Sequence, residues 1–302
     1  MHSFNFWWRL LRPHTLTASF VPVIIGSVYA LGFTEHFRFS LFLAMLIASM
    51  AIQAGTNLFN EYYDYKRGLD TAESVGIAGA IVHDGASPRF VLNCALACYI
   101  LAALLGIYIC AHSSWLLILI GAFCMLVGYL YTGGPYPISA SPFGEVFAGG
   151  FLGTGVICIS FFLQTHTVTW QCVLISVPTL ILIGLILTSN NLRDRVGDEQ
   201  NGRKTLVILL GHQKSVKFMT VMLAVCYFWP LVLMLTIHMS PAVMLCLFSI
   251  TPAMKAVKIF TPESQTPAQM MPAMKYIAQT NTVYGLLYAA GLFINNYSVM
   301  LL

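Results

Sequence analysis

A series of long apolar runs constrains the fold of this sequence more than any other feature. A helix needs about 20 predominantly apolar residues to cross roughly 30 Å of hydrocarbon. Runs of that length lie near residues 15–33, 40–60, 91–111, 115–132, 146–163, 171–190, 215–237, 241–260 and 281–302. Because only helices and closed barrels satisfy their own backbone hydrogen bonds in lipid, these runs predict an all-α integral membrane protein with nine transmembrane helices.

Charged residues are scarce and gather on one side of the predicted membrane. Asp, Glu, Lys and Arg make up 9% of the 302 residues, against about 25% in soluble domains. With nine spans, one side carries all 15 Lys and Arg residues except Arg38, and all acids except Glu35. Basic residues mark the cytoplasmic side. We therefore expect a cytoplasmic N-terminus and one membrane-embedded domain, residues 1–302, in the plasma membrane.

The second run ends in a polar cluster, "NLFNEYYDYKRGLD", at residues 57–70. Spacings of i, i+3, i+4 and i+7 place four of its side chains on one helix face. These are Asn57, Asn60, Glu61 and Asp64. Gly68 offers a helix stop, after which Asp70 can fold back beside that face. The C-terminal end of a helix disfavours acids, so these carboxylates need a compensating partner.

A matching polar cluster ends the sixth run, in "LTSNNLRDRVGDEQNGRKTL" at residues 187–206. Asn191, Asp194 and Asp198 again follow i, i+3 and i+7, and Asn190 lies one turn before Asp194. The second and sixth spans run in the same direction, so both acidic ends emerge on the cytoplasmic side. This correspondence predicts two four-helix repeats, spans 1–4 and 5–8, plus a ninth helix, with a site where the repeats meet.

Facing sets of carboxylate and amide oxygens favour a hard cation. Mg²⁺ binds through one or two carboxylates and completes its octahedron with substrate phosphate oxygens. The second cluster also contains Arg193, Arg203 and Lys204, which can pair with phosphate. We interpret the two clusters as a Mg²⁺–diphosphate site. An ion or proton path remains an alternative, as does an interfacial salt-bridge cluster that uses residues such as Lys66 and Arg67.

A diphosphate held at the mouth of a helix bundle suggests an allylic polyprenyl diphosphate, whose tail enters the lipid. Metal ions stabilise the diphosphate as it leaves, and aromatic side chains can face the allylic cation. Tyr131 is our main aromatic candidate, among Tyr62, Tyr63, Tyr65 and Tyr129. The Gly-rich run "AGGFLGTG" in the fifth span favours close helix packing, and the eight cysteines form no CxxC pair, so no disulfide framework or zinc site is expected.

The two polar clusters resemble the hallmark motifs of the UbiA-type intramembrane prenyltransferases. Within that superfamily, the "DxxxGxD" and "NNxRDxxxDxxNGRKTL" patterns are similar to those of the branch that prenylates 1,4-dihydroxy-2-naphthoate. Further similar stretches are "LRPHTLTASFVPVIIG", "ESVGIAGAIVHDG", "YLYTGGPYPIS" and "FGEVFAGGFLG". The resemblance implies transfer of a polyprenyl group to this acceptor, with loss of CO₂ and diphosphate, to give demethylmenaquinone.

The resemblance also implies roles for individual residues. Asn60, Glu61, Asp64 and Asp70 would hold one Mg²⁺ and diphosphate oxygens, with Glu61 standing where an Asp is frequent in the family. Asp194 and Asp198 would hold a second ion beside Asn190 and Asn191. Lys204 and Arg193 would steady the diphosphate. His83 or Arg89 would meet the carboxylate of the acceptor, and Glu145 would orient the acceptor or serve as a loop acid.

Other functions remain open from the sequence. Within the same superfamily, the acceptor could be 4-hydroxybenzoate, homogentisate or haem. A transporter built on repeats is disfavoured because no span carries a charge near its middle, and a purely structural scaffold leaves the paired acids unexplained. The expected partners are a polyprenyl diphosphate, an aromatic acceptor and the lipid bilayer, with no nucleic acid. Neither the prenyl chain length nor the oligomeric state follows from the sequence.

Overall fold

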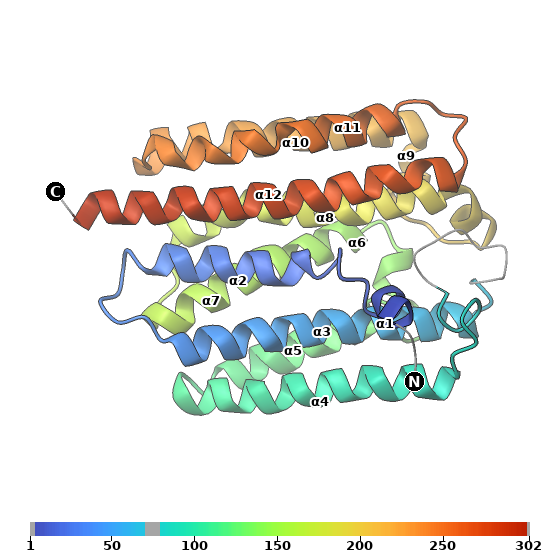
Figure 1. Ribbon diagram of the computed structural model, residues 1–302, viewed down its shortest axis with the longest axis horizontal. Helices are drawn as coiled ribbons and strands as arrows, with labels where there is room; N and C mark the ends of the chain where they lie inside the picture. Colours follow the sequence, from blue (N-terminus) through green and yellow to red (C-terminus); the bar gives the residue numbers. More distant parts are fainter. Residues whose placement is uncertain (1–3, 70–78, 301–302) are drawn as a thin grey trace.

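The protein is a bundle of roughly parallel and antiparallel helices, seen in a computed structural model that describes residues 4–69 and 79–300 (Figure 1). No strand occurs in these two ranges, which agrees with the predicted all-α class. The elements are α1 (Phe4–Leu11), α2 (Thr17–Ala30), α3 (Phe39–Lys66), α4 (Pro88–His112), α5 (Leu117–Leu130), η1 (Ile138–Ala140), α6 (Gly144–Ala148), η2 (Gly149–Gly155), α7 (Val156–Thr165), α8 (Trp170–Gln200), α9 (Leu206–Leu210), α10 (His212–Ile237), η3 (Pro241–Ser249), α11 (Ile250–Phe260) and α12 (Pro267–Met300).

Six helical segments in the described part of the chain are long and apolar enough to cross a membrane. They are α3, α4, the continuous α6–η2–α7 segment, α8, α10 and the η3–α11 segment. The apolar helices α2 and α5 are shorter. The predicted apolar runs coincide with helices, but the last helix, α12, begins at Pro267 rather than near residue 281. Proline fits the first turn of a helix, where its missing N–H is not needed.

The two predicted polar clusters lie at the same end of the bundle. Figure 1 shows the C-terminal ends of α3 and α8 together with α1 and α9, on the side opposite the α2–α3 connection. As predicted, α3 stops before a glycine: Gly68 has a φ of +72°, and the Leu69 amide donates to the Asp64 carbonyl at 2.9 Å. The Asn and Asp residues of the second cluster are helical, because α8 continues to Gln200, whereas Arg203 and Lys204 follow the helix.

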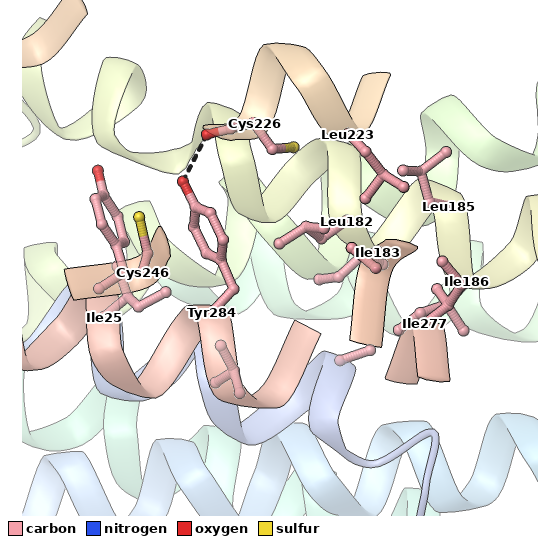
Figure 2. Packing of buried hydrophobic residues seen from close by; sticks show 14 of the residues in the cluster. Ile25, Leu182, Ile183, Leu185, Ile186, Leu223, Cys226, Cys246, Ile277 and Tyr284 are labelled. Atoms are coloured by element: carbon pink, nitrogen blue, oxygen red, sulfur yellow. Dashed lines mark hydrogen bonds between the residues drawn. The ribbon is translucent and has the colours of Figure 1, made fainter. Parts of the chain in front are cut away.

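A dense core lies between α2, α8, α10 and α12. Tyr284 and Tyr288 of α12 are fully buried there. The Tyr284 hydroxyl donates to the Cys226 carbonyl at 2.8 Å (Figure 2), and the Tyr288 hydroxyl donates to the Ile175 carbonyl at 3.3 Å. Each buried hydroxyl therefore has an acceptor, as a low-dielectric interior requires. All eight cysteines are free.

The Gly-rich run forms η2, a π-helix that lies directly against α8. A Cβ atom built on Gly149 would come within 2.2 Å of the Leu180 carbonyl oxygen, and one on Gly153 within 2.7 Å of the Leu180 Cα. No larger residue fits these two positions without movement of α8. The predicted packing role of the run is therefore confirmed.

Candidate active site

One large cavity connects the polar helix ends with the apolar interior of the bundle. Its volume is about 520 Å³, within the range of small-molecule sites. The apolar part of its wall comes from α3, α4, α5, η2 and α8. The polar part contains ten of the predicted site residues: Asn57, Asn60, Asp64, Tyr131, Asn190, Asn191, Arg193, Asp194, Asp198 and Arg203. Residues 140 positions apart in the chain thus share one mouth.

The acidic face of α3 is held by hydrogen bonds from the segment between α1 and α2. The Asn57 amide donates to Thr15 Oγ1 at 2.9 Å and to the Leu11 carbonyl at 3.2 Å. The Asn60 amide oxygen accepts from Arg12 at 2.9 Å, and its NH₂ group donates to Asp64 Oδ2 at 2.7 Å. Asn60 therefore fixes the orientation of the Asp64 carboxylate toward the cavity.

Glu61 does not lie where a metal ligand of this cavity is expected. Its carboxylate is 2% exposed and does not line the cavity. It accepts from Arg12 at 3.2 Å, from the Gly79 amide at 2.9 and 3.1 Å, and from the Ile81 amide at 3.2 Å. At 3.6 residues per turn, Glu61 lies about 60° around the helix axis from Asp64. That rotation turns its side chain toward the loop before α4.

The second cluster presents its acids along α8. Asn190 and Asn191 lie on the cavity wall, and the Asn191 amide donates to Glu145 Oε1 at 2.9 Å. Arg193 donates through Nε to Asp194 Oδ1 at 2.7 Å, and its NH1 group contacts the Met274 sulfur at 3.1 Å. Glu145 itself is buried outside the cavity wall, and its Oε2 atom has no hydrogen-bond partner among the described residues.

Arg203 joins the two clusters. One guanidinium nitrogen lies 3.1 Å from Asp64 Oδ1, and the other lies 3.2 Å from Asp198 Oδ1. The turn after α8 brings Arg203 back over the helix end, because Gly202 adopts a φ of +75° and the Arg203 amide donates to the Asp198 carbonyl at 3.0 Å. A positive φ of this kind favours glycine.

Three predicted site residues do not join this arrangement. Lys204 is exposed and absent from the cavity wall, and its backbone amide donates to the Ala140 carbonyl at 2.9 Å. His83 and Arg89 are likewise exposed and lie away from the wall, so the geometry gives no support to the acceptor role expected of them. Asp70 lies outside the described residues. Of the five candidate tyrosines, Tyr131 alone lines the cavity.

The segment between α1 and α2 supplies site residues that the sequence patterns did not indicate. Arg12, His14 and Thr15 line the cavity, and Arg12 adopts a φ of +49°. Burial lowers the pKa of His14 to about 4, and the positive charges of Arg12, Arg193 and Lys275 add to this effect. His14 is therefore neutral near pH 7. The available signal was "RPHT", a basic pair beside proline immediately before an apolar run.

The donor set fits a hard divalent cation. No group of three or more His, Cys, Asp or Glu side chains is gathered for a metal within residues 4–69 and 79–300. The oxygen atoms of Asp64 and Asp198, however, already share one cationic partner, the Arg203 guanidinium. Asp194, Asn60 and Asn190 line the same cavity. Carboxylate and amide oxygens of this kind suit Mg²⁺.

These features define a helical membrane protein with an ionic site at the mouth of a largely apolar chamber. The chain belongs to the UbiA prenyltransferase family, whose sequence pattern it matches over residues 19–296. It is 51% identical over 290 residues to the 1,4-dihydroxy-2-naphthoate octaprenyltransferase of Bacillus subtilis, covering 96% of this chain and 93% of that protein. The octaprenyltransferase of the same name from Mycobacterium tuberculosis is 33% identical over 78% of this chain and 80% of its own length.

Solved structures support the fold. A UbiA homologue from Archaeoglobus fulgidus, solved with DMAPP and Mg²⁺ bound, matches 94% of this chain and 99% of that chain with a TM-score of 0.59 at 16% identity. A UbiA homologue from Aeropyrum pernix, solved in its apo form, matches 93% of this chain and 98% of that chain with a TM-score of 0.63 at 14% identity. At these identities the structural likeness concerns the fold alone.

Proposed function

We propose that this protein transfers a polyprenyl group from an allylic polyprenyl diphosphate to 1,4-dihydroxy-2-naphthoate. The allylic C–O bond breaks, and its electron pair leaves with the diphosphate. A C–C bond forms at the ring carbon that bears the carboxylate, and CO₂ leaves that carbon while its bonding electrons restore the aromatic ring. The product is demethylmenaquinone in its quinol form. The 51% identity to a protein of the corresponding name supports this choice of acceptor.

One observation carries the proposal: the two Asn-and-acid helix ends meet at the mouth of a cavity whose remaining wall is largely apolar. A diphosphate needs cations and hydrogen-bond donors, whereas a polyprenyl tail needs an apolar channel. The ionic mouth supplies the first through Arg193 and Arg203. Small side chains such as Ala102, Gly106 and Gly121 line the apolar part and leave room for the second.

In this proposal Asp64 and Asn60 of α3 would hold one Mg²⁺, and Asp194 and Asp198 of α8 would hold a second. Asp70 remains a proposed ligand outside the described residues. When bound, Mg²⁺ stabilises the negative charge that develops on the leaving diphosphate. Asn57 and Glu61 keep a positioning role, because their hydrogen bonds hold the segment before α2 and the loop before α4 against the acidic face of α3.

The protein's own groups also orient the reacting partners. Because Asn191 donates its amide to Glu145, its carbonyl oxygen remains free to accept from a ligand in the cavity. The Tyr131 ring lies on the wall, where it can face an allylic cation. His14 is a neutral hydrogen-bonding group at the same mouth. These polar groups are available to the hydroxyl and the carboxylate of the acceptor.

We further propose the full membrane arrangement predicted from the sequence. The six long segments, together with α2, α5 and α12, give nine spans in a single domain of residues 1–302, arranged as two four-helix repeats plus one helix. The basic residues favour a cytoplasmic N-terminus and an active site facing the cytoplasm of a plasma membrane. Lys204 is then available to meet diphosphate oxygens that project from the mouth.

A membrane assay for prenylated product by mass spectrometry tests the function. Membranes receive octaprenyl diphosphate with 1,4-dihydroxy-2-naphthoate or, in parallel, 4-hydroxybenzoate, with and without Mg²⁺. We expect metal-dependent product from the naphthoate. Loss of a carboxylate that would hold Mg²⁺ weakens the positive charge that stabilises the departing diphosphate, which costs several kcal/mol. Asp64→Asn and Asp194→Asn should therefore each reduce the rate by roughly 10²-fold or more.

The matched control is Glu35→Gln, which removes an exposed carboxylate at the opposite end of the bundle and should leave the rate unchanged. Product from 4-hydroxybenzoate alone would refute the acceptor but keep the reaction class. Absence of product from both acceptors, in protein that remains monodisperse, would refute the prenyltransferase function.

A further inference from the structure

Each acidic side chain that the structure describes on the cavity wall pairs with an arginine. Asp64 and Asp198 share Arg203, and Asp194 forms a bidentate pair with Arg193. Side-chain exposure is 17% for Arg203, 14% for Asp64 and 11% for Asp198. This degree of burial matters, because partly buried ion pairs are much less screened than surface pairs. Asp64, Asp194 and Asp198 thus already have cationic partners within the protein itself.

Of the two arginines, Arg203 has the more informative position. Arg193 contacts an acid next to it on the same helix, whereas Arg203 bridges α3 and α8 with one nitrogen on each carboxylate. A cation that contacts Asp64 Oδ1 and Asp198 Oδ1 together has to lie between them. A divalent ion coordinated by either of these oxygen atoms would need the space beside it that a guanidinium nitrogen now occupies, so guanidinium and metal would exclude one another there.

We infer that Arg203 is a stand-in cation that keeps the metal site closed to free divalent ions until a diphosphate arrives. The inference rests on the proposed function. When a diphosphate enters the mouth, the guanidinium transfers from the two carboxylates to phosphate oxygens, and the carboxylates become free for the metal. Guanidinium groups suit this exchange, because they bind carboxylate and phosphate with the same planar, two-point geometry.

The local structure permits the exchange without movement of either helix. Arg203 follows the Asn201–Gly202 turn rather than lying within α8. Its backbone amide stays bonded to the Asp198 carbonyl, so rotation of the side chain alone can redirect the guanidinium. Asp64 would keep its hydrogen bond from Asn60 and Arg67 would remain 3.9 Å from its Oδ1 atom, which preserves the orientation of the carboxylate.

The exchange couples the affinities of the two ligands. A free divalent ion has to displace Arg203 from both carboxylates without bringing an anion for it, whereas an ion that arrives with a diphosphate brings one. By linkage, the metal raises the affinity for diphosphate by the same factor as the diphosphate raises the affinity for the metal. Removal of the guanidinium should therefore increase binding of the metal alone and decrease binding of the diphosphate.

Binding of Mn²⁺, measured by the EPR signal of the free ion, tests the inference on purified full-length protein in detergent without any diphosphate. We expect Arg203→Gln to bind Mn²⁺ about tenfold tighter than the wild type or more, since a unit charge a few ångströms from the ion is removed. Arg203→Lys should show a smaller gain, because an ammonium group cannot bridge both carboxylates with the same geometry. That variant also provides the test if Arg203→Gln fails to give a monodisperse protein.

The matched control is Arg195→Gln. It removes one positive charge from the same segment, but Arg195 pairs at 3.7 Å with the exposed Glu199 and lies outside the cavity wall. We expect its Mn²⁺ affinity to match the wild type. The double variant Asp64→Asn/Arg203→Gln should lose the gain in Mn²⁺ affinity.

A second readout is the melting temperature, which in the wild type should rise with Mg²⁺ plus inorganic diphosphate far more than with either alone.

Equal Mn²⁺ affinities for Arg203→Gln and Arg195→Gln would overturn the inference, and so would a gain that persists when Asp64 is replaced. Neither measurement requires turnover. A wild-type protein that forms prenylated product, but whose Arg203 variants gain no Mn²⁺ affinity, would refute the stand-in role alone. Absence of product from the wild type would refute the proposed function and leave the Mn²⁺ result as a property of the site.

Discussion

The two lobes of the bundle use similar helices in opposite ways. In the lobe built around α8, α10 and α12, the most apolar stretch of α8 is 67% buried, and tyrosine hydroxyls bond to backbone carbonyls inside the core (Figure 2). In the lobe of α3, α4 and α5, the corresponding stretches are 39% buried in α3 and 22% in α4, the latter close to the 28% of the peripheral helix α10. The small side chains of this second lobe surround the cavity instead.

The two lobes serve two separate purposes, stability of the fold and space for the substrate, which a membrane enzyme has to combine. Helix association in lipid depends on close packing and interhelical hydrogen bonds rather than on the hydrophobic effect, so the dense lobe holds the fold together. The open lobe can then leave space for a long apolar substrate. The helices α3 and α8 stand at the boundary, and their ends carry the acids of both clusters.

The largest effect predicted from this comparison concerns the open lobe, formed by α3, α4 and α5. Gly121 lines the cavity, and a Cβ atom placed on it meets nothing within 4 Å. We expect Gly121→Phe to fill the chamber and to lower kcat/KM for octaprenyl diphosphate by roughly tenfold to a hundredfold, a loss of about 1.4 to 2.8 kcal/mol. Geranyl diphosphate, being shorter, should be affected less.

The same assay on Leu119→Phe provides the control for Gly121→Phe, because Leu119 is 69% exposed on α5 and lies away from the cavity wall. Equal losses for the long and the short substrate would contradict the assignment of this lobe to the prenyl chain.

The next effect concerns the contact of η2 with α8. Because a Cβ atom on Gly149 would lie 2.2 Å from the Leu180 carbonyl oxygen, Gly149→Ala should lower the free energy of unfolding by about 1–3 kcal/mol through overpacking. Thermal unfolding in detergent measures this change. Gly150→Ala is the neighbouring control, since its Cβ meets nothing within 4 Å, and a similar melting temperature for both variants would show that the contact does not constrain the fold.

A smaller effect is expected inside the dense lobe itself. Tyr284→Phe removes the hydroxyl that donates to the Cys226 carbonyl. Interhelical hydrogen bonds in membrane proteins contribute about 0.6 kcal/mol on average and rarely more than about 1.7, so we expect a destabilisation in that range with catalysis retained. Tyr136→Phe, at a 92% exposed position, should not change the melting temperature. A loss of activity in Tyr284→Phe at unchanged stability would contradict the assignment of the lobe of α8, α10 and α12 to stabilising the fold.

The last effect is pH-dependent and lies at the boundary between the lobes. The pKa of His14 is about 4 in the folded protein against an ordinary value of 6.5, so between these values the unfolded chain binds more protons. Stability should therefore fall as the pH drops from 6.5 toward 4. We expect the loss of melting temperature between pH 7.5 and pH 5 to be smaller in His14→Gln than in the wild type. His36→Gln, at an exposed position, should show the full wild-type loss.

The sequence predicted the parts of this molecule that follow from periodicity. The spacing of Asn57, Asn60 and Asp64 is enough to place them on one face of a helix, and the direction of the spans brings that face to the same side as Asp194 and Asp198. The structure shows these residues on one cavity wall. The packing role of the glycine run follows in the same way, because small residues at helical spacing allow close approach.

Other features depend on tertiary placement and have no periodic signal. Arg12 reaches Asn60 and Glu61 from a turn with a positive φ, a backbone state that is uncommon for non-glycine residues. Helix spacing assigned Glu61 to the metal face, yet the amides of a loop almost 20 residues later bind its carboxylate. The start of α12 could not be fixed from the sequence, because its polar and proline-containing first turns resemble a loop.

The contacts of Glu61 also give the length of its side chain a structural role. One carboxylate connects the end of α3 with the segment before α2 and with the loop that leads into α4. An aspartate would be shorter by one methylene group, so all three attachments would have to move inward together or be released. The reach of this side chain therefore acts as a fixed spacer that sets how far two flanking segments stand from the helix between them.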